Sequence, residues 1–481
     1  MFKLAPLSAA IVLALAGQVM AADSTSTQSQ EGKSNIAEVS QSLAPFASAI
    51  QSQTGQGHNH MAVQDNSTSD IHQTATGSYN AGYAEQLFEN GSQINQQAGG
   101  TYNDAFASQS SGEENRVLQM QQGAENASTV WQETQLGSQA TTLQSGQRNE
   151  AFVEQMFGGG NNKSQIMQDG TGNYAAAEHL THNNGDIQIY QQGKENWAYG
   201  DQRDGQGGTI SIDQGGTGNS VEVWQDNQSN SKASVTQNGQ LNEGIVDQSF
   251  GEANKVSLTQ KGNANATWSD QFETNNSTTS ISQTGNNNLH YTYQNGDNHS
   301  LTVSTQGNNN KITASNWKGD KMGGQFGSSQ TAVVNQNGNG NAVNLTQNGD
   351  NHLARYNQKG NNNSVESKQA DSNNELYFDQ NGSDNILIAD QRGTDNYAYG
   401  NTQGSGNSIT LDQSGYSNQS YTNQLYGSGN EVTIKQTDSI NVAYVTQGGQ
   451  TNKAFVDQSG IAQTATISQL GSGNLATVTQ K

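Results

Sequence analysis

The chain has 481 residues, no cysteine and a formal net charge of −22 at pH 7. Hydrophobic residues make up only 30% of it, and this composition alone would predict disorder, because few apolar side chains are available for a core. The acidic balance argues against nucleic acid as a partner. The absence of cysteine excludes a fold held together by disulfides.

Residues 1–21 have the features of a secretory signal peptide. Lys3 precedes an apolar run over residues 7–16, and small residues surround the expected cleavage site after Ala21, with Ala22 as the alternative. The apolar run is too short to span a membrane. We therefore expect an exported protein in which the polar residues 22–34 form a flexible N-terminal segment.

A repeat dominates the chain from residue 35 to 481. Glutamine returns every eleven or twelve residues, usually followed by glycine two residues later and by asparagine five residues later. A period this short and persistent indicates a solenoid. The repeat is blurred over residues 35–80 and again over residues 317–325, and we expect both segments to be irregular.

Each unit is predicted to be one strand followed by a tight arc. Between Asn452 and Gln458, small or apolar residues alternate with polar, charged or aromatic ones. This period of two predicts a strand and excludes a helix. The four-residue arcs, such as residues 459–462, contain glycine and are too short for a crossover helix. Only two prolines occur in the chain, which fits an all-strand structure.

Stacking these units predicts an all-β fold, a cross-β solenoid of two-strand coils. Each coil takes about 22 residues, and about twenty coils spaced about 4.8 Å apart give a stack on the order of 90 Å long. Equivalent amides then hydrogen-bond in columns, whereas each buried amide without a partner would cost about 1–3 kcal/mol. The unpaired strands at both ends can template another chain, so the solenoid is expected to be amyloid-forming.

The residues expected to build the ladders and arcs recur at the repeat spacing. The amide-ladder and related structural residues are Ser231, Gln237, Asn242, Gln248, Gln260, Asn341, Gln347, Gln358, Gln369, Gln380, Asn385, Gln391, Asn441, Gln447, Asn452, Gln458, Gln469, Asn474 and Gln480. The turn glycines, expected at positive φ, are Gly239, Gly338, Gly349, Gly360, Gly382, Gly393, Gly449, Gly460 and Gly471.

Aspartate often precedes the glutamine on the outward face. These residues, which we interpret as gatekeepers, are Asp247, Asp270, Asp379, Asp390, Asp412 and Asp457. Asp247 with Asp270, and Asp390 with Asp412, are expected to stack about 5 Å apart, where like charges repel. Gatekeeping would slow assembly until export is complete and predicts faster fibre growth at about pH 5 than at about pH 8. The alternative is a solvated surface without a role in assembly.

We identify no catalytic residues, no metal ligands and no cofactor, and we do not expect an enzyme. His58 and His60 are the best metal candidates, but two spaced histidines are more often ordinary loop residues. Acids that recur in every coil do not mark one active site. Outward aromatic residues such as Trp131 and Trp268 suggest a matrix polysaccharide as a partner, against an ordinary preference of aromatic residues for strands.

The unit resembles the curlin repeat of bacterial curli fibre subunits, whose pattern is Ser-x5-Gln-x-Gly-x-x-Asn-x-Ala-x3-Gln. The segment from Ser231 to Gln248 matches this pattern, with Gly244 in place of the alanine. The second half of the pattern recurs at Asn149, Asn196, Asn441 and Asn452. The chain is much longer than a usual subunit, and asparagine often takes the position of the serine, so the subtype stays open.

The resemblance implies a structural subunit of extracellular curli-like amyloid fibres, serving adhesion and the biofilm matrix. Such a subunit is secreted unfolded through an outer-membrane curli-type secretion pore and polymerises with itself at the cell surface, with a nucleator subunit as a further partner. The resemblance does not separate the main subunit from the nucleator. The competing interpretation is a monomeric secreted β-solenoid, either an adhesin or a polysaccharide-binding protein.

Overall fold

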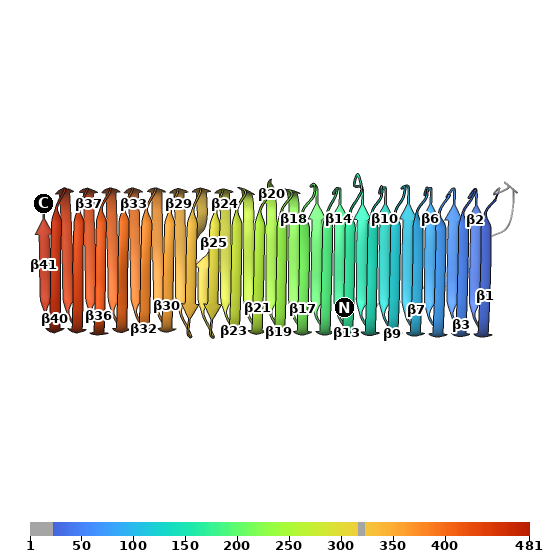
Figure 1. Ribbon diagram of the computed structural model, residues 1–481, viewed down its shortest axis with the longest axis horizontal. Helices are drawn as coiled ribbons and strands as arrows, with labels where there is room; N and C mark the ends of the chain where they lie inside the picture. The colour runs from blue at the N-terminus through green and yellow to red at the C-terminus, as the bar shows by residue number, and fades with distance from the viewer. Residues whose placement is uncertain (1–22, 316–322) are drawn as a thin grey trace.

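A computed structural model describes residues 23–315 and 323–481 (Figure 1). Every regular element in these residues is a β-strand, and the strands lie side by side along one long axis, from β1 (Thr25–Lys33) at one end to β41 (Leu475–Gln480) at the other. The expected signal peptide and residues 316–322 lie outside the described residues. In the described ranges no helix has the length and apolarity needed to cross a membrane.

The strands form two parallel sheets, here called sheet A and sheet B. Sheet A consists of β1, β3 (Ser48–Gln56), β5 (Asp70–Ser78), β7 (Gln93–Thr101), β9 (Arg116–Ala124), β11 (Gln139–Gln147), β13 (Lys163–Thr171), β15 (Asp186–Lys194), β17 (Thr209–Thr217), β19 (Lys232–Gln240), β21 (Lys255–Asn263), β23 (Thr278–Asn286), β25 (Ser300–Gln306), β28 (Thr331–Asn337), β30 (Leu353–Asn361), β32 (Glu375–Ser383), β34 (Tyr397–Ser405), β36 (Gln419–Ser428), β38 (Val442–Gln450) and β40 (Thr464–Ser472).

Sheet B consists of β2 (Ile36–Ser42), β4 (Asn59–Asp65), β6 (Ala81–Leu87), β8 (Asp104–Ser110), β10 (Ala127–Glu133), β12 (Glu150–Met156), β14 (Tyr174–Leu180), β16 (Trp197–Arg203), β18 (Ser220–Ser229), β20 (Glu243–Glu252), β22 (Ala266–Asn275), β24 (Leu289–Asp297), β26 (Lys311–Ala314), β27 (Gly324–Ser328), β29 (Ala342–Asp350), β31 (Ser364–Ser372), β33 (Ile386–Thr394), β35 (Ser408–Tyr416), β37 (Glu431–Ser439), β39 (Lys453–Ile461) and β41.

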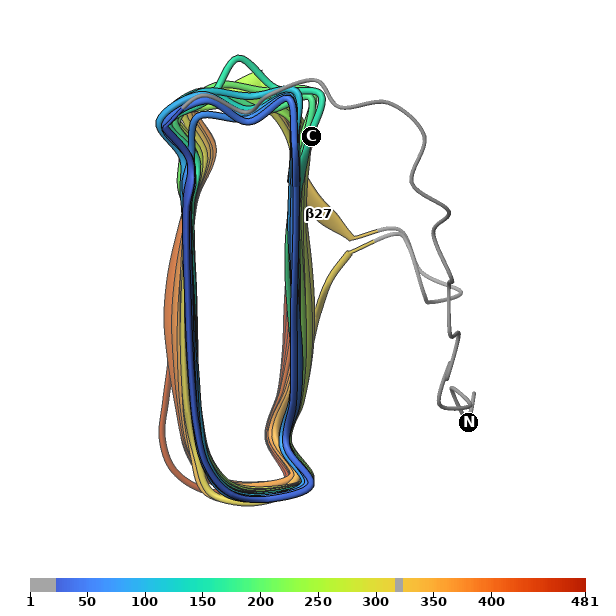
Figure 2. The same ribbon diagram turned by 90° about the vertical axis from the view of Figure 1, so that its right-hand side faces the viewer.

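Consecutive strands alternate between the two sheets, so one strand of each sheet makes one coil. Each strand pairs in parallel with the equivalent strands one coil before and one coil after, as β19 does with β17 and β21. Viewed down the long axis, the coils superpose as a flattened loop with two straight sides and two arcs (Figure 2). The all-β solenoid of stacked two-strand coils is therefore confirmed.

The coil is longer than predicted over most of the chain. Before residue 300 the register usually advances by 23 residues, as from Lys232 to Lys255, whereas after residue 331 it usually advances by the predicted 22, as from Leu353 to Glu375. The extra residue lies between the ladder glutamine of sheet B and the next strand of sheet A. Six residues separate Gln248 from Lys255, the first residue of β21, whereas five separate Gln347 from Leu353, the first residue of β30.

Residues 25–33 form a strand, so the flexibility predicted for the segment 22–34 is wrong over these residues. All nine residues of β1 pair in register with β3. Gln28 donates to Gln51 Oε1 at 3.0 Å, and Gln30 donates to Gln53 Oε1 at 2.8 Å. Side-chain amides order this strand, although it contributes no apolar side chain to the core.

The predicted irregularity of residues 35–80 is also wrong, because β2 to β5 form regular coils. The repeat is blurred because the glutamine ladder of sheet A runs two residues closer to the strand start there. Gln73 and Gln96 carry the ladder, while the later ladder position is occupied by Ala75 and Ala98. The ladder changes column between Gln119 and Gln121, which lie on the same strand.

The core is a single layer of small aliphatic side chains between the sheets, such as Ala454 and Val456, which are almost completely buried. Two larger residues, Tyr356 and Phe378, occupy adjacent coils of sheet A. The next residue of this column is Gly400, where an added Cβ would lie 2.1 Å from the Phe378 ring. The absent side chain at position 400 therefore makes room for the phenylalanine.

One coil is divided by an insertion. Strands β26 and β27 both pair with β24 on one side and β29 on the other, so together they fill one level of sheet B. β27 begins outside the outline of the other coils (Figure 2). The ladder nevertheless passes through, because Gln294 donates to Gln325 and Gln325 donates to Gln347 at 2.7 and 2.9 Å.

Candidate functional site: stacked ladders and open ends

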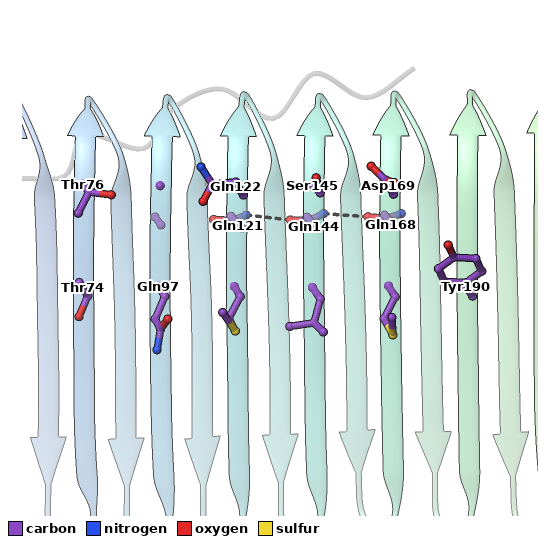
Figure 3. A pocket seen from close by; sticks show the side chains of 15 residues that line it. Thr74, Thr76, Gln97, Gln121, Gln122, Gln144, Ser145, Gln168, Asp169 and Tyr190 are labelled. Carbon is purple, nitrogen blue, oxygen red and sulfur yellow. Dashed lines mark hydrogen bonds between the residues drawn. The ribbon is translucent and has the colours of Figure 1, made fainter.

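The glutamines form hydrogen-bonded ladders parallel to the long axis. In sheet A, Gln121 donates to Gln144 and Gln144 donates to Gln168, both at 2.9 Å (Figure 3). In sheet B the column runs from Gln41 to Gln480. Every described coil of sheet B has glutamine there except the one that contains His179.

Most of these glutamines also link the two sheets. Gln358 Nε2 donates one hydrogen to Gln380 Oε1 at 2.9 Å and the other to the Ala342 carbonyl of sheet B at 3.1 Å. Because this Nε2 faces a carbonyl, exchanging it with Oε1 would place two acceptors together. The orientation is therefore fixed, and each glutamine ladder donates toward the C-terminal end of the solenoid.

The asparagine ladder points the other way. Asn242 donates through both its main-chain N–H and its Nδ2 to Asn219 Oδ1, each at 3.0 Å, one coil toward the N-terminus. Its Nδ2 also reaches the Gly262 carbonyl of the following coil at 2.8 Å. This ladder lies at the arc that leads from sheet A to sheet B. The two kinds of ladder thus give the stack a chemical direction.

The structure places the predicted ladder residues in four columns. The sheet A glutamine column contains Gln237, Gln260, Gln358, Gln380, Gln447 and Gln469. The sheet B column contains Gln248, Gln347, Gln369, Gln391, Gln458 and Gln480. One asparagine column contains Asn242, Asn341, Asn385, Asn452 and Asn474. The column at the opposite arc contains Ser231 and Asn441, whose side-chain oxygens accept main-chain N–H bonds from the next coil.

The turn glycines divide between the two arcs. Gly239, Gly338, Gly360, Gly382, Gly449 and Gly471 follow the glutamine of sheet A, and Gly349, Gly393 and Gly460 follow that of sheet B. All have positive φ. At Gly360 (φ 116°) an added Cβ would lie 2.0 Å from the Gly382 carbonyl oxygen. Stacking of coils therefore forbids a side chain at this position.

The six predicted gatekeepers have different surroundings. Asp247 stacks on Asp270, and Asp390 stacks on Asp412. Asp390 forms an ion pair with Arg392. The other two are exposed and have favourable neighbours: Asn357 Nδ2 donates to Asp379 Oδ1 at 2.5 Å, and Asp457 lies opposite Lys435 in the register. The pair of Asp247 and Asp270 is therefore where repulsion between acids is largest among the six.

Burial and the Asp247 carboxylate raise the pKa of Asp270 to about 7, and burial also raises the pKa of Asp247. Because these folded-state pKa values exceed the unfolded ones, protonation stabilises the coil as the pH falls through about 7. Buried histidines form an opposing set of groups, whose burial the sequence pattern does not reveal. Burial lowers the pKa of His60 from 6.5 to about 4, and those of His179 and His290 to about 3.

These two sets of groups predict a maximum of fibre growth near pH 6.5. Stability supplied by neutral histidine is lost as the pH falls below about 6.5, whereas stability supplied by protonated Asp270 is lost as the pH rises through about 7. The lag time should therefore be shorter at about pH 6.5 than at about pH 8, and longer again at about pH 5. Replacing both Asp247 and Asp270 by asparagine should remove the difference between pH 6.5 and 8, while Asp379→Asn should keep it. Equal wild-type lag times at pH 6.5 and 8 would contradict this role.

His179 interrupts the sheet B ladder. It occupies the glutamine position between Gln155 and Gln202 and is completely buried. Gln155 Nε2 donates to Ser164 Oγ at 3.0 Å, and His179 Nδ1 lies 3.1 Å from the same oxygen. The glutamine spacing in the sequence shows that this histidine stands at a glutamine position, but only the stacked coils show that it divides the ladder.

The variant His179→Gln is expected to join the two parts of the ladder and to remove a buried group that must stay neutral. We expect stabilisation by about 1–3 kcal/mol, largest below about pH 6.5, measured as an increased urea midpoint of the circular dichroism signal. The outward, exposed His72 provides the matched control, since His72→Gln should change little. A decreased midpoint for His179→Gln at both about pH 5 and about pH 7.5 would contradict this account.

A shallow groove of about 640 Å³ lies on the outer face of sheet A (Figure 3). Its apolar side chains form one column over four coils, namely Met120, Leu143, Met167 and Tyr190. Outward aromatic rings elsewhere also stack along the axis, as Trp268 does on Tyr291 at 4.6 Å and an interplanar angle of 5°. In the part of the chain that the structure describes, no group of three or more histidine or acidic side chains could hold a metal ion.

Each end of the solenoid presents strands that pair on one side only. Among the described residues, β1 and β2 pair only with β3 and β4, and β40 and β41 pair only with β38 and β39. β1 is exposed along its whole length. Parallel strand edges with free N–H and C=O groups are sites for the addition of further strands.

Five segments of the chain match the family model of the curlin associated repeat: residues 228–262, 251–285, 382–415, 404–437 and 452–481. These segments fall on regular coils, including the last coil, although the segment 382–415 contains Thr402, which takes the glutamine position of the sheet A ladder. Among curated proteins none matches the chain.

Proposed function

We propose that this chain, which carries curlin repeats, is a structural subunit of an extracellular curli-like amyloid fibre. It is exported through the N-terminal signal expected from the sequence and polymerises with itself at the cell surface, where the fibre serves adhesion and the biofilm matrix. We assign it no enzymatic activity, because the repeat family is structural.

The observation that carries this proposal is the pair of open ends with directed ladders. Gln480 points its donors away from β39 at one end, while Gln28, Gln30 and Gln41 stand at the other with their donors turned into the stack. Glutamine donors at one end facing glutamine acceptors at the other favour addition of another copy in one orientation. The described coils thus supply both halves of a polymer contact.

Seeded polymerisation tests this proposal. The chain from Ala22 onward is diluted from denaturant over a range of concentrations, with and without fragments of preformed fibre. We expect a lag that shortens with concentration and disappears on seeding, because free ends are then supplied. A stable monomer at every concentration, with or without seeds, would contradict the subunit role.

A monomeric polysaccharide-binding protein or adhesin is the second candidate, and the groove along Met120 to Tyr190 is the observation that favours it. This second function would replace the first if the purified chain stayed monomeric and bound a glycan. For the fibre subunit, a curli-type secretion pore, a nucleator subunit and matrix polysaccharide are the partners that we propose.

A further inference from the structure

We propose that the last coil of one copy docks on the first coil of the next in a single register that continues the solenoid. This inference rests on the proposed fibre function and specifies its subunit contact. Strand β41 would lie on β2 of the next copy, and β40 would lie on β1. The columns of glutamine, asparagine and glycine that run through the internal coils then continue across the contact.

The two strands of sheet B at this contact have the same pattern. β41 has the sequence Leu-Ala-Thr-Val-Thr-Gln, and β2 begins Ile-Ala-Glu-Val-Ser-Gln. When they are stacked from the first residue of each, alanine meets alanine, valine meets valine, and Gln480 meets Gln41. Sliding by one residue would turn the apolar side chains of one strand out of the core, so the pattern selects this register.

The difference in residue number that aligns β41 with β2 also aligns β40 with β1 in sheet A. β40 has the sequence Thr-Ala-Thr-Ile-Ser-Gln-Leu-Gly-Ser, and β1 has Thr-Ser-Thr-Gln-Ser-Gln-Glu-Gly-Lys. Gln469 then meets Gln30. Gly471, with φ 114°, meets Gly32, with φ 120°. Because one displacement serves both sheets, the arc between them also aligns, and Asn474 meets Asn35.

The directions of the ladders are complementary at this contact. Gln480 Nε2 donates to the Thr464 carbonyl at 3.1 Å, and its second hydrogen is directed along the ladder toward Gln41 Oε1 of the next copy. The asparagine ladder runs oppositely, so the Asn35 N–H of the next copy would donate to Asn474 Oδ1, as Asn474 donates to Asn452 at 3.1 Å. If two copies met by their C-terminal ends, the glutamine donors of one copy would face the glutamine donors of the other.

One inward pair in this register is unlike the internal coils. Ile467 would cover Gln28, whose Nε2 donates to Gln51 Oε1 at 3.0 Å and to the Ala37 carbonyl at 3.1 Å. The Gln28 oxygen would therefore face an apolar side chain. We infer that the contact between copies is the weakest level of the fibre, so that shearing should break fibres there first.

Cysteine pairs test the register, since the chain has no cysteine of its own. The first register pair is Thr479→Cys with Ser40→Cys on sheet B, and the second is Ser468→Cys with Ser29→Cys on sheet A. Each would hold its Cα atoms about 4.8 Å apart across the contact, within disulfide reach. The matched control, Thr479→Cys with Glu38→Cys, is out of register and would hold them about 8 Å apart, beyond reach.

Each double variant is assembled under reducing conditions, and the fibres are then oxidised with copper and dissolved oxygen, which accepts the two electrons released by each thiol pair. After dissolution without reductant, we expect a series of covalent multimers from both register pairs and at least about tenfold less from the control. The two register pairs lie on different sheets. If one double variant fails to fold, the other still tests the register.

Fibres that give equal cross-linking in register and control pairs, or none in either register pair, would overturn the proposed register while the subunit function stands. Failure of the unmodified chain to form fibres would instead overturn the proposed function.

Discussion

Replacing Gly360 by alanine is expected to disrupt the coils on both sides of it. The glycine has φ 116°, and an added Cβ would lie 2.0 Å from the Gly382 carbonyl oxygen. Backbone strain of about 1–3 kcal/mol and overpacking of about 1–3 kcal/mol together predict destabilisation by roughly 2–6 kcal/mol. The measurement is the urea midpoint of the strand signal in circular dichroism, together with the yield of fibres.

Gly406→Asn provides the matched control. Gly406 also has positive φ, 63°, but an added Cβ there has no heavy atom within 4 Å. Its neighbours one and two coils before, Asp384 and Asn362, already adopt φ 57°. The Gly406→Asn variant should therefore be close to the wild type. A Gly360→Ala variant as stable as the Gly406→Asn variant would show that the carbonyl column is not as close-packed as described.

Removing ladder residues at the end of the stack is expected to slow fibre growth more than removing them from the middle. In the double variant Gln469→Ala with Gln480→Ala, an incoming copy loses two ladder bonds and buries acceptors without partners. At about 1–3 kcal/mol for each unsatisfied group, growth should slow by on the order of tenfold or more. The rate is followed as elongation from wild-type seeds.

Gln347→Ala with Gln358→Ala is the control, because it also removes one glutamine from each sheet. These residues have ladder partners on both sides, so their loss should lower stability within the chain and leave the growing ends intact. Similar elongation rates for the two double variants would refute a special role of the end ladders.

The sequence predicts the repeating part of this fold well because two requirements repeat together. The inward Ala and Val of each unit need a core, and the amides that bracket them need partners one coil away. Both are satisfied only if strands stack in register, as Gln237 does on Gln260. The columns of Gln, Asn and Gly can therefore be expected from the sequence alone.

Other features could not be predicted from the same pattern. Strand β1 has no apolar inward residue, so a criterion based on apolar alternation misses it, although Gln28 and Gln30 extend the ladders. The length of the longer coils is visible in the glutamine spacing, as from Gln237 to Gln260, but the place of the extra residue after the sheet B ladder is seen only in the stack. The acidity of Asp270 and of the buried histidines depends on burial, which arises only when the coils are stacked.

Fibre diffraction of material assembled from the purified chain tests the central claim most directly. A subunit that stacks its coils along the fibre should give a meridional reflection near 4.8 Å and an equatorial one near 10 Å, from fibres that seed fresh monomer. A soluble, strand-rich monomer that forms no fibre under these conditions would contradict the account, and it would mean that the open ends of the solenoid do not recruit a second copy.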